Sequence, residues 1–197
     1  MVVTAEAVHR EEIANALTHG VGALASAAAG AVLVTLATPG TRLQLISAIV
    51  FCSSLLLLYT ASTLYHAIPS PAAKRALKVC DHCAIYMLIA GTYTPFALIG
   101  LRGAVGWWLF GVAWGLAALG MAFKLFFTGR FKLFSTLVYI GMGWMAVFAI
   151  RPMIEHLSFI QDPKRWGYPF QRGHLEMTHT DFELIATTMG LDPATLL

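Results

Sequence analysis

Five long apolar segments, separated by short connections, limit what this chain can fold into. They run over residues 17–38, 43–65, 80–101, 104–127 and 133–150. A helix that crosses a bilayer needs about 20 mostly apolar residues, which is the length of these segments. In lipid every backbone polar group must be hydrogen-bonded within the structure, and helices achieve this locally. The sequence therefore predicts an all-α integral membrane helix bundle with five transmembrane helices.

The composition excludes an ordinary soluble domain. Of the 197 residues, 58% are hydrophobic and 12% are charged, whereas soluble domains carry about 25% charged residues. The net charge is +3 and the basic residues are scattered through the connections, so we expect membrane lipids as partners and no nucleic acid. Residues 152–197 have charges, prolines and no apolar run long enough to cross. We expect a polar tail there, with one short amphipathic helix near residues 182–189.

The distribution of Lys and Arg predicts the orientation in the membrane. Short cytoplasmic connections carry an excess of these residues. The connections on one side collect Arg42, Arg102 and Arg151 together with the tail, and those on the other collect Arg10, Lys74, Arg75, Lys78, Lys124, Arg130 and Lys132. We therefore expect a multi-pass protein of the plasma membrane with the N-terminal segment 1–16 in the cytoplasm. An odd number of spans then puts the tail outside.

The ionisable residues at the ends of the second and third segments are the first functional candidates. Such residues at membrane depth cost several kcal/mol unless they are paired or bind a metal. Ser62 and His66 are four apart on one helix face, and we expect Asp81 to open the next helix across a short loop. His66 would supply an imidazole nitrogen to Zn²⁺, with Asp81 holding a metal-bound water. The alternative is that His66 lies at the headgroup level and Asp81 caps its helix, because a zinc site needs three or four ligands.

Other polar residues would support this site. Glu12, Asn15 and His19 recur at spacings of three and four, so they form one stripe on the first helix. They would provide a proton relay or support the metal site, and the alternative is a capping and interfacial polar face. His82 is adjacent to Asp81 and must point to a different face, where we expect it to form hydrogen bonds within the interface.

Three motifs in the same order resemble the hemolysin III family, bacterial relatives of the progestin and adipoQ receptors. They are EEIANALTHGVGA at Glu11–Ala23, S-x-x-x-H at Ser62–His66 and DHCAIYMLIAGTYTPF at Asp81–Phe96. The resemblance covers residues 10 to 150 and implies a seven-helix fold with a cytoplasm-facing zinc site. In that fold one histidine comes from the end of helix two, two come from the start of helix seven, and an aspartate of helix three interacts through water. On this resemblance His66 matches the first ligand, Asp81 the aspartate and Ser62 the serine of the motif.

The sequence departs from the family pattern beyond residue 155. We find no sixth or seventh span there and no H-x-x-x-H opening an apolar run. His174 and His179 are five apart, and the expected topology puts them outside while His66 is inside, so neither receives a ligand role. A truncation or frameshift before helix six, or an unrelated replacement, would leave such a tail. A second copy of the chain is another source of the missing ligands, which makes a homo-oligomer an open alternative.

These observations leave several functions open. The resemblance implies a hemolysin III-like multi-pass membrane protein with a family-type zinc site at the cytoplasmic ends of helices two and three. One alternative is a Zn²⁺-dependent lipid amide or ester hydrolase, or a receptor, of the adipoQ-receptor type, with Asp81 and Ser62 as catalytic residues. Another is a non-enzymatic protein that alters bilayer permeability, because the family name implies cytolysis. The last is a truncated, non-functional homologue. The missing helix-seven histidines favour these last two for this chain.

Overall fold

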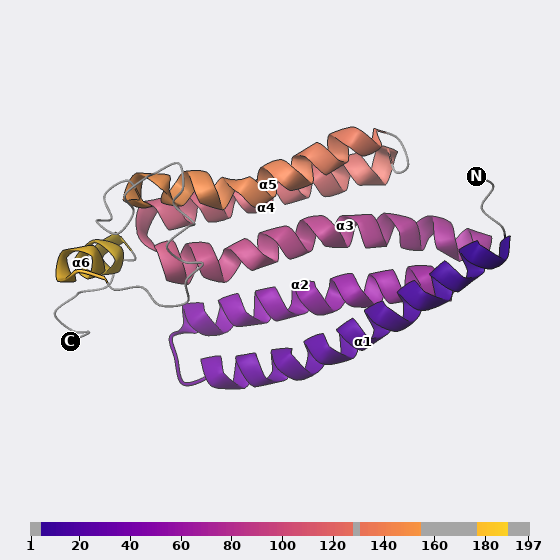
Figure 1. Cartoon of the computed structure of the whole chain (residues 1–197), viewed down its shortest axis with the longest axis horizontal. Helices are drawn as coiled ribbons and strands as arrows, with labels where there is room; N and C mark the ends of the chain where they lie inside the picture. Colours follow the sequence, from indigo (N-terminus) through magenta and orange to yellow (C-terminus); the bar gives the residue numbers. More distant parts are fainter. Residues whose placement is uncertain (1–4, 128–130, 155–176, 189–197) are drawn as a thin grey trace.

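The computed structural model describes residues 5–127, 131–154 and 177–188, and almost all of these are helical. The helices are α1 (Ala5–Ala37), α2 (Arg42–Ala67), α3 (Pro71–Pro95), its π-helical continuation η1 (Phe96–Leu101), α4 (Gly103–Phe127), α5 (Lys132–Ile154) and α6 (His179–Thr188). Helices α1 to α5 lie side by side in an elongated bundle, and the short α6 lies at one end of it (Figure 1). The described residues contain no strand, which confirms the all-α prediction.

The surface of the bundle is that of a membrane protein. Helices α1, α2, α3 with η1, and α4 are each long and apolar enough to cross a bilayer, and α5 has a shorter apolar stretch at Leu133–Phe148. Large apolar side chains point outward, with Leu24 75%, Leu119 69% and Phe126 80% exposed. A soluble protein rarely exposes such side chains in a contiguous patch. The predicted membrane helix bundle is confirmed.

Two helices extend beyond their apolar segments. At 33 residues, α1 is about 50 Å long, which exceeds the hydrocarbon thickness of about 30 Å. Helix α3 begins at Pro71, so the connection that follows α2 is only residues 68–70. Lys74 therefore lies on a helix and not in a loop. The prediction that Asp81 opens its helix is wrong, because proline suits a first helical turn and α3 starts ten residues earlier.

Helix α3 is the centre of the bundle. It packs against α2 on one side and against α4 and α5 on the other. Small residues allow these close approaches. A Cβ atom at Gly91 would lie 2.1 Å from the Ser54 hydroxyl oxygen of α2, and one at Gly120 of α4 would lie 2.3 Å from the ring of Tyr86. The close contact of α2 with α3 brings the polar ends of these two helices together.

Candidate functional site

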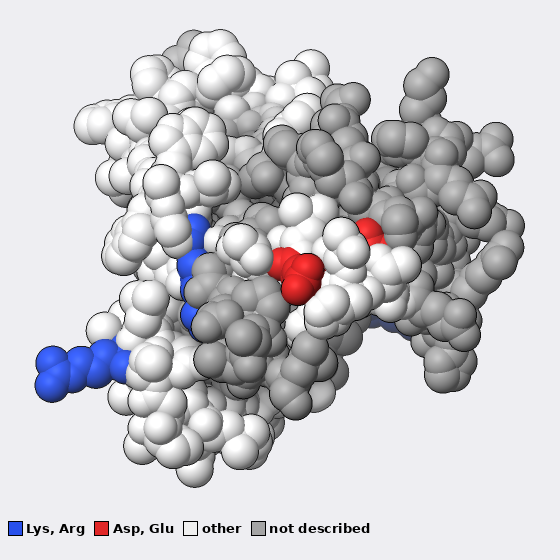
Figure 2. All heavy atoms as spheres, turned by 90° about the vertical axis from the view of Figure 1, so that its left-hand side faces the viewer, with Lys and Arg blue, Asp and Glu red and all other residues white. Residues whose placement is uncertain are grey.

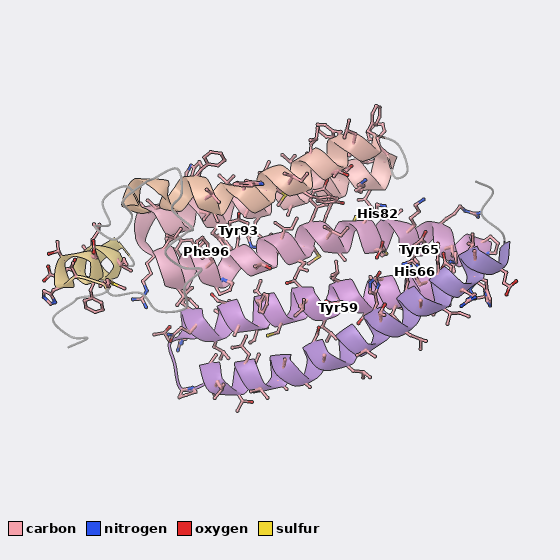
Figure 3. The ribbon with its side chains drawn as sticks, in the orientation of Figure 1. Tyr59, Tyr65, His66, His82, Tyr93 and Phe96 are labelled. Carbon is pink, nitrogen blue, oxygen red and sulfur yellow. The ribbon has the colours of Figure 1, made fainter. Side chains whose placement is uncertain are left out.

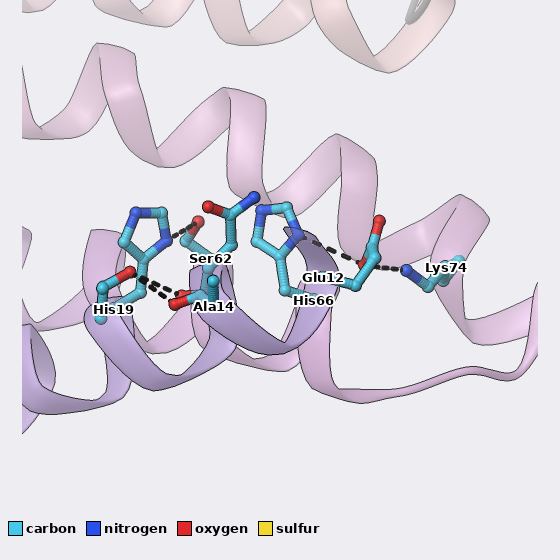
Figure 4. A network of polar contacts seen from close by, with 8 residues as sticks. Glu12, Ala14, His19, Ser62, His66 and Lys74 are labelled. Carbon is cyan, nitrogen blue, oxygen red and sulfur yellow. Dashed lines mark hydrogen bonds and ion pairs between the residues drawn. The ribbon is translucent and has the colours of Figure 1, made fainter. Parts of the chain in front are cut away.

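One end of α1, α2 and α3 carries a polar contact that joins all three helices (Figure 4). Glu12 of α1 accepts a hydrogen bond from Lys74 of α3 and also lies 3.3 Å from Nδ1 of His66 of α2. The Lys74 ammonium lies 5.1 Å from the centre of the Tyr65 ring, a cation–π contact. Glu12 precedes the apolar segment that begins at residue 17, and the hydrogen bond from Lys74 lowers the pKa of its carboxyl from the ordinary value. At neutral pH Glu12 is therefore an anion between two cationic or hydrogen-bonding partners.

A second polar contact lies deeper in the bundle and joins α1 to α2. Nδ1 of His19 is 2.6 Å from the hydroxyl oxygen of Ser62. Ser62 is 6% exposed, so water competes weakly for this contact. The Asp81 carboxylate of α3 lies near Ser62.

The two contacts meet at the histidine rings. The ring centres of His19 and His66 are 5.8 Å apart, with one edge directed at the other face, and Asp81 is close enough to His66 to interact with it electrostatically. We call these residues the α1–α3 polar cluster; its members are Glu12, His19, Ser62, His66, Lys74 and Asp81. The structure thus brings together five of the residues predicted for the site, with Lys74 in addition.

Two further predicted residues lie beside this cluster. The side chain of Asn15 is on an exposed part of α1, and its backbone carbonyl accepts a hydrogen bond from Thr18. Nδ1 of His82 lies 3.4 Å from a carboxylate oxygen of Asp81, but this buried atom has no hydrogen-bond partner among the described residues. The carbonyl of His82 accepts a hydrogen bond from Tyr139 of α5 at 3.2 Å.

Sequence reasoning missed Lys74 and Tyr139 as neighbours of the site. The apolar segments predict that Lys74 lies in a loop, although Pro71 three residues before it is a helix-start signal. Tyr139 gave no signal, because a single tyrosine in an apolar helix is ordinary and its contact joins residues 57 apart in the chain.

The described residues include side chains of the types that bind zinc, but too few of them lie together to form a zinc site. His66 presents Nδ1 to a carboxylate, which leaves its Nε2 as the ring nitrogen for a metal. Within residues 5–127, 131–154 and 177–188, however, no three His, Cys, Asp or Glu side chains are arranged to hold a metal ion. His179 lies in α6 at the opposite end of the bundle (Figure 1), where it faces Glu183 at 3.3 Å. His174 lies outside the described residues.

A comparison with protein families identifies the kind of protein to which this bundle belongs. A family model described as Haemolysin-III related matches residues 7–171. The chain belongs to the hemolysin III family. The resemblance seen in the motifs is therefore confirmed, and it extends over most of the chain.

Two relatives of this hemolysin III family member are similar to it over about three quarters of its length, and a third over a short stretch. Hemolysin-3 of Bacillus cereus is 49% identical over 150 residues, which are 76% of this chain and 68% of the relative. A Hemolysin-3 homolog of Bacillus subtilis is 47% identical over 150 residues, which are 76% of this chain and 70% of the relative. A UPF0310 protein of Bacillus licheniformis is 48% identical over 40 residues, which are 20% of this chain and 27% of that protein. No solved structure matches the chain.

Proposed function

We propose that this chain is a multi-pass protein of the plasma membrane, with its N-terminus and the α1–α3 polar cluster on the cytoplasmic side. The basic residues of α3, with Lys74 among them, lie at the cluster end. On the opposite end, which Figure 2 shows, charged side chains of the described residues are few and scattered. Excess positive charge marks cytoplasmic ends.

Thiol labelling of intact cells tests this orientation. Cys80 is exposed near the cluster end of α3, and Thr38 is exposed in the connection at the other end. A membrane-impermeant maleimide should label a Thr38→Cys variant in intact cells and label Cys80 only after the cells are opened. The reverse pattern would place the cluster outside the cell.

We further propose that the cluster contributes part of a zinc site of the hemolysin III type, with His66 as the direct ligand and Asp81 acting through water. The observation that supports this is Glu12 at 3.3 Å from Nδ1 of His66, since carboxylates commonly orient metal-binding histidines in this way. The described residues do not fit a complete zinc centre, because such a centre needs at least three protein ligands. The others have to come from outside the described residues or from a second copy of the chain.

The metal content of the purified protein tests the zinc proposal. We expect zinc to remain on the wild-type chain and to be lost from a His66→Ala variant. A His179→Ala variant is the matched control, because His179 is exposed and lies at the far end of the bundle; it should retain zinc. If the wild-type chain holds no zinc after it has been dialysed against a zinc-containing buffer and the free metal removed, the zinc proposal is overturned. The hydrolase and receptor alternatives fall with it.

The second candidate is a non-enzymatic protein that alters bilayer permeability. Two observations favour it: the described ligand set is incomplete, and the similar relatives are named Hemolysin-3. The purified chain in liposomes should release an entrapped dye faster than an unrelated five-span protein at the same density. Equal release from the two proteins would remove this candidate.

A further inference from the structure

Helix α5 contains a turn that a hydroxyl from another helix bridges. Tyr93 of α3 is 6% exposed. Its hydroxyl donates to the carbonyl of Met142 at 2.6 Å, with the carbonyl oxygen of Gly143 next to it at 3.1 Å, and accepts from the amide of Ala146 at 2.9 Å. A regular α-helix pairs the amide of each residue with the carbonyl four residues earlier. The Tyr93 hydroxyl therefore lies between two backbone groups that a regular helix would pair directly.

The surroundings leave this turn room to change. A side chain inserted into the backbone ladder is a recognised cause of helix bends. Gly141 and Gly143 border the turn, and a Cβ atom at either position would have no neighbour within 4 Å. The part of α5 before the turn is held separately, because Tyr139 packs against Tyr86 and hydrogen-bonds to the carbonyl of His82. Tyr93 is thus the polar contact that holds the turn, well away from His66 along the bundle (Figure 3).

The turn borders a groove between α3 and α5. The groove has a volume of about 470 Å³ and is lined by Leu88, Ile89, Thr92, Tyr93, Phe96, Gly143 and Ala146. Its two hydroxyl groups already have partners, since Thr92 donates to the carbonyl of Leu88 at 2.8 Å and Tyr93 bridges α5. A change in the bend of α5 moves Ala146 and so alters the width of this groove.

We propose that the Met142–Ala146 turn is a hinge, with the Tyr93 hydroxyl as its latch. With the latch engaged, Met142 and Ala146 each bond to the hydroxyl. When Tyr93 withdraws, they pair with each other and the helix straightens, so the backbone is satisfied in both states. An element with two satisfied arrangements can switch between them. Straightening by about 20° over the roughly 9 Å from Met142 to Phe148 would move Phe148 by about 3 Å.

Spin-label distances in the full-length chain test the hinge. In a variant without the native cysteines, labels at Phe148→Cys and Leu36→Cys report the part of α5 beyond the turn, since both positions are exposed. Labels at Ile140→Cys and Leu24→Cys report the part before it and are the reference pair. Tyr93→Phe keeps the ring and removes the latch, so we expect the first distance to shift by about 3 Å and the reference distance to stay unchanged.

A proline separates the hinge from a general packing defect. Ala146→Pro removes the amide and prevents the direct pairing with Met142, so adding it to Tyr93→Phe should restore the wild-type distance. An unchanged first distance in Tyr93→Phe, or an equal change in the reference pair, overturns the proposal. If Tyr93→Phe does not accumulate in the membrane, the single variant Ala146→Pro tests the hinge by itself. The hinge requires Ala146→Pro to accumulate and to keep the wild-type distance between the labels at Phe148→Cys and Leu36→Cys. Failure of Ala146→Pro to accumulate refutes the hinge.

Discussion

The hydrogen bond between His19 and Ser62 predicts a measurable coupling energy between these two residues. Nδ1 of His19 lies 2.6 Å from the Ser62 hydroxyl oxygen, and Ser62 is 6% exposed, so water competes weakly for the contact. A typical intramolecular hydrogen bond contributes about 0.5–1.5 kcal/mol in soluble proteins, whereas double-mutant cycles between membrane helices average about 0.6 kcal/mol with a maximum near 1.7. We therefore expect a coupling energy of about 1 kcal/mol between His19 and Ser62.

The coupling is measured with His19→Ala, Ser62→Ala and the double variant. Each protein is unfolded in mixed micelles by titration with dodecyl sulfate, and tryptophan fluorescence gives the free energy of unfolding. The control cycle combines Ser62→Ala with Glu12→Gln, which belongs to the other contact of the cluster; its coupling should stay below about 0.5 kcal/mol. A His19–Ser62 coupling no larger than this control would refute the contact between α1 and α2 at these residues.

Three further predictions use the same unfolding assay. Gly120→Ala should lower the dodecyl sulfate concentration at the midpoint of unfolding, because its Cβ would overlap the Tyr86 ring at a cost of about 1–3 kcal/mol. In the control Gly115→Ala the new Cβ meets no atom within 4 Å, so this variant should gain up to about 1 kcal/mol from helix propensity. Equal midpoints for the two variants would contradict the packing described. Glu12→Gln should lower the midpoint by removing the contacts to Lys74 and His66, whereas Glu11→Gln, at an exposed position, should leave it unchanged. Because the pKa of the Glu12 carboxyl is lowered in the folded chain, its contribution is complete above the ordinary carboxyl pKa and is lost as the pH falls through the lowered value. The midpoints of wild type and Glu12→Gln should therefore converge in acid, and a gap that persists there would count against this ion pair.

The residue pattern alone is enough to predict the class of fold and five of the six members of the α1–α3 polar cluster. Apolar segments of spanning length leave the backbone no partner but itself, so five such segments require a helix bundle. Ser62 and His66 share a face because residues four apart always do in a helix. The order of the motifs was enough to indicate the family, which the family comparison confirmed.

The ends of the helices and the pairing of the polar groups depend on how the helices pack together. Asp81 lies in the third turn of α3 and not at its start, because residues 71–80 are helical outside the apolar segment, where Lys74 pairs with Glu12 of α1. The contacts that define the site and the hinge join residues far apart in the chain: Glu12 and His66 are 54 apart, and Tyr93 and Met142 are 49 apart. Helical periodicity shows which side chains share a face, but the neighbour of that face depends on how closely remote helices approach. Small residues such as Gly91 and Gly120 set that approach, and their effect exists only once the helices are packed.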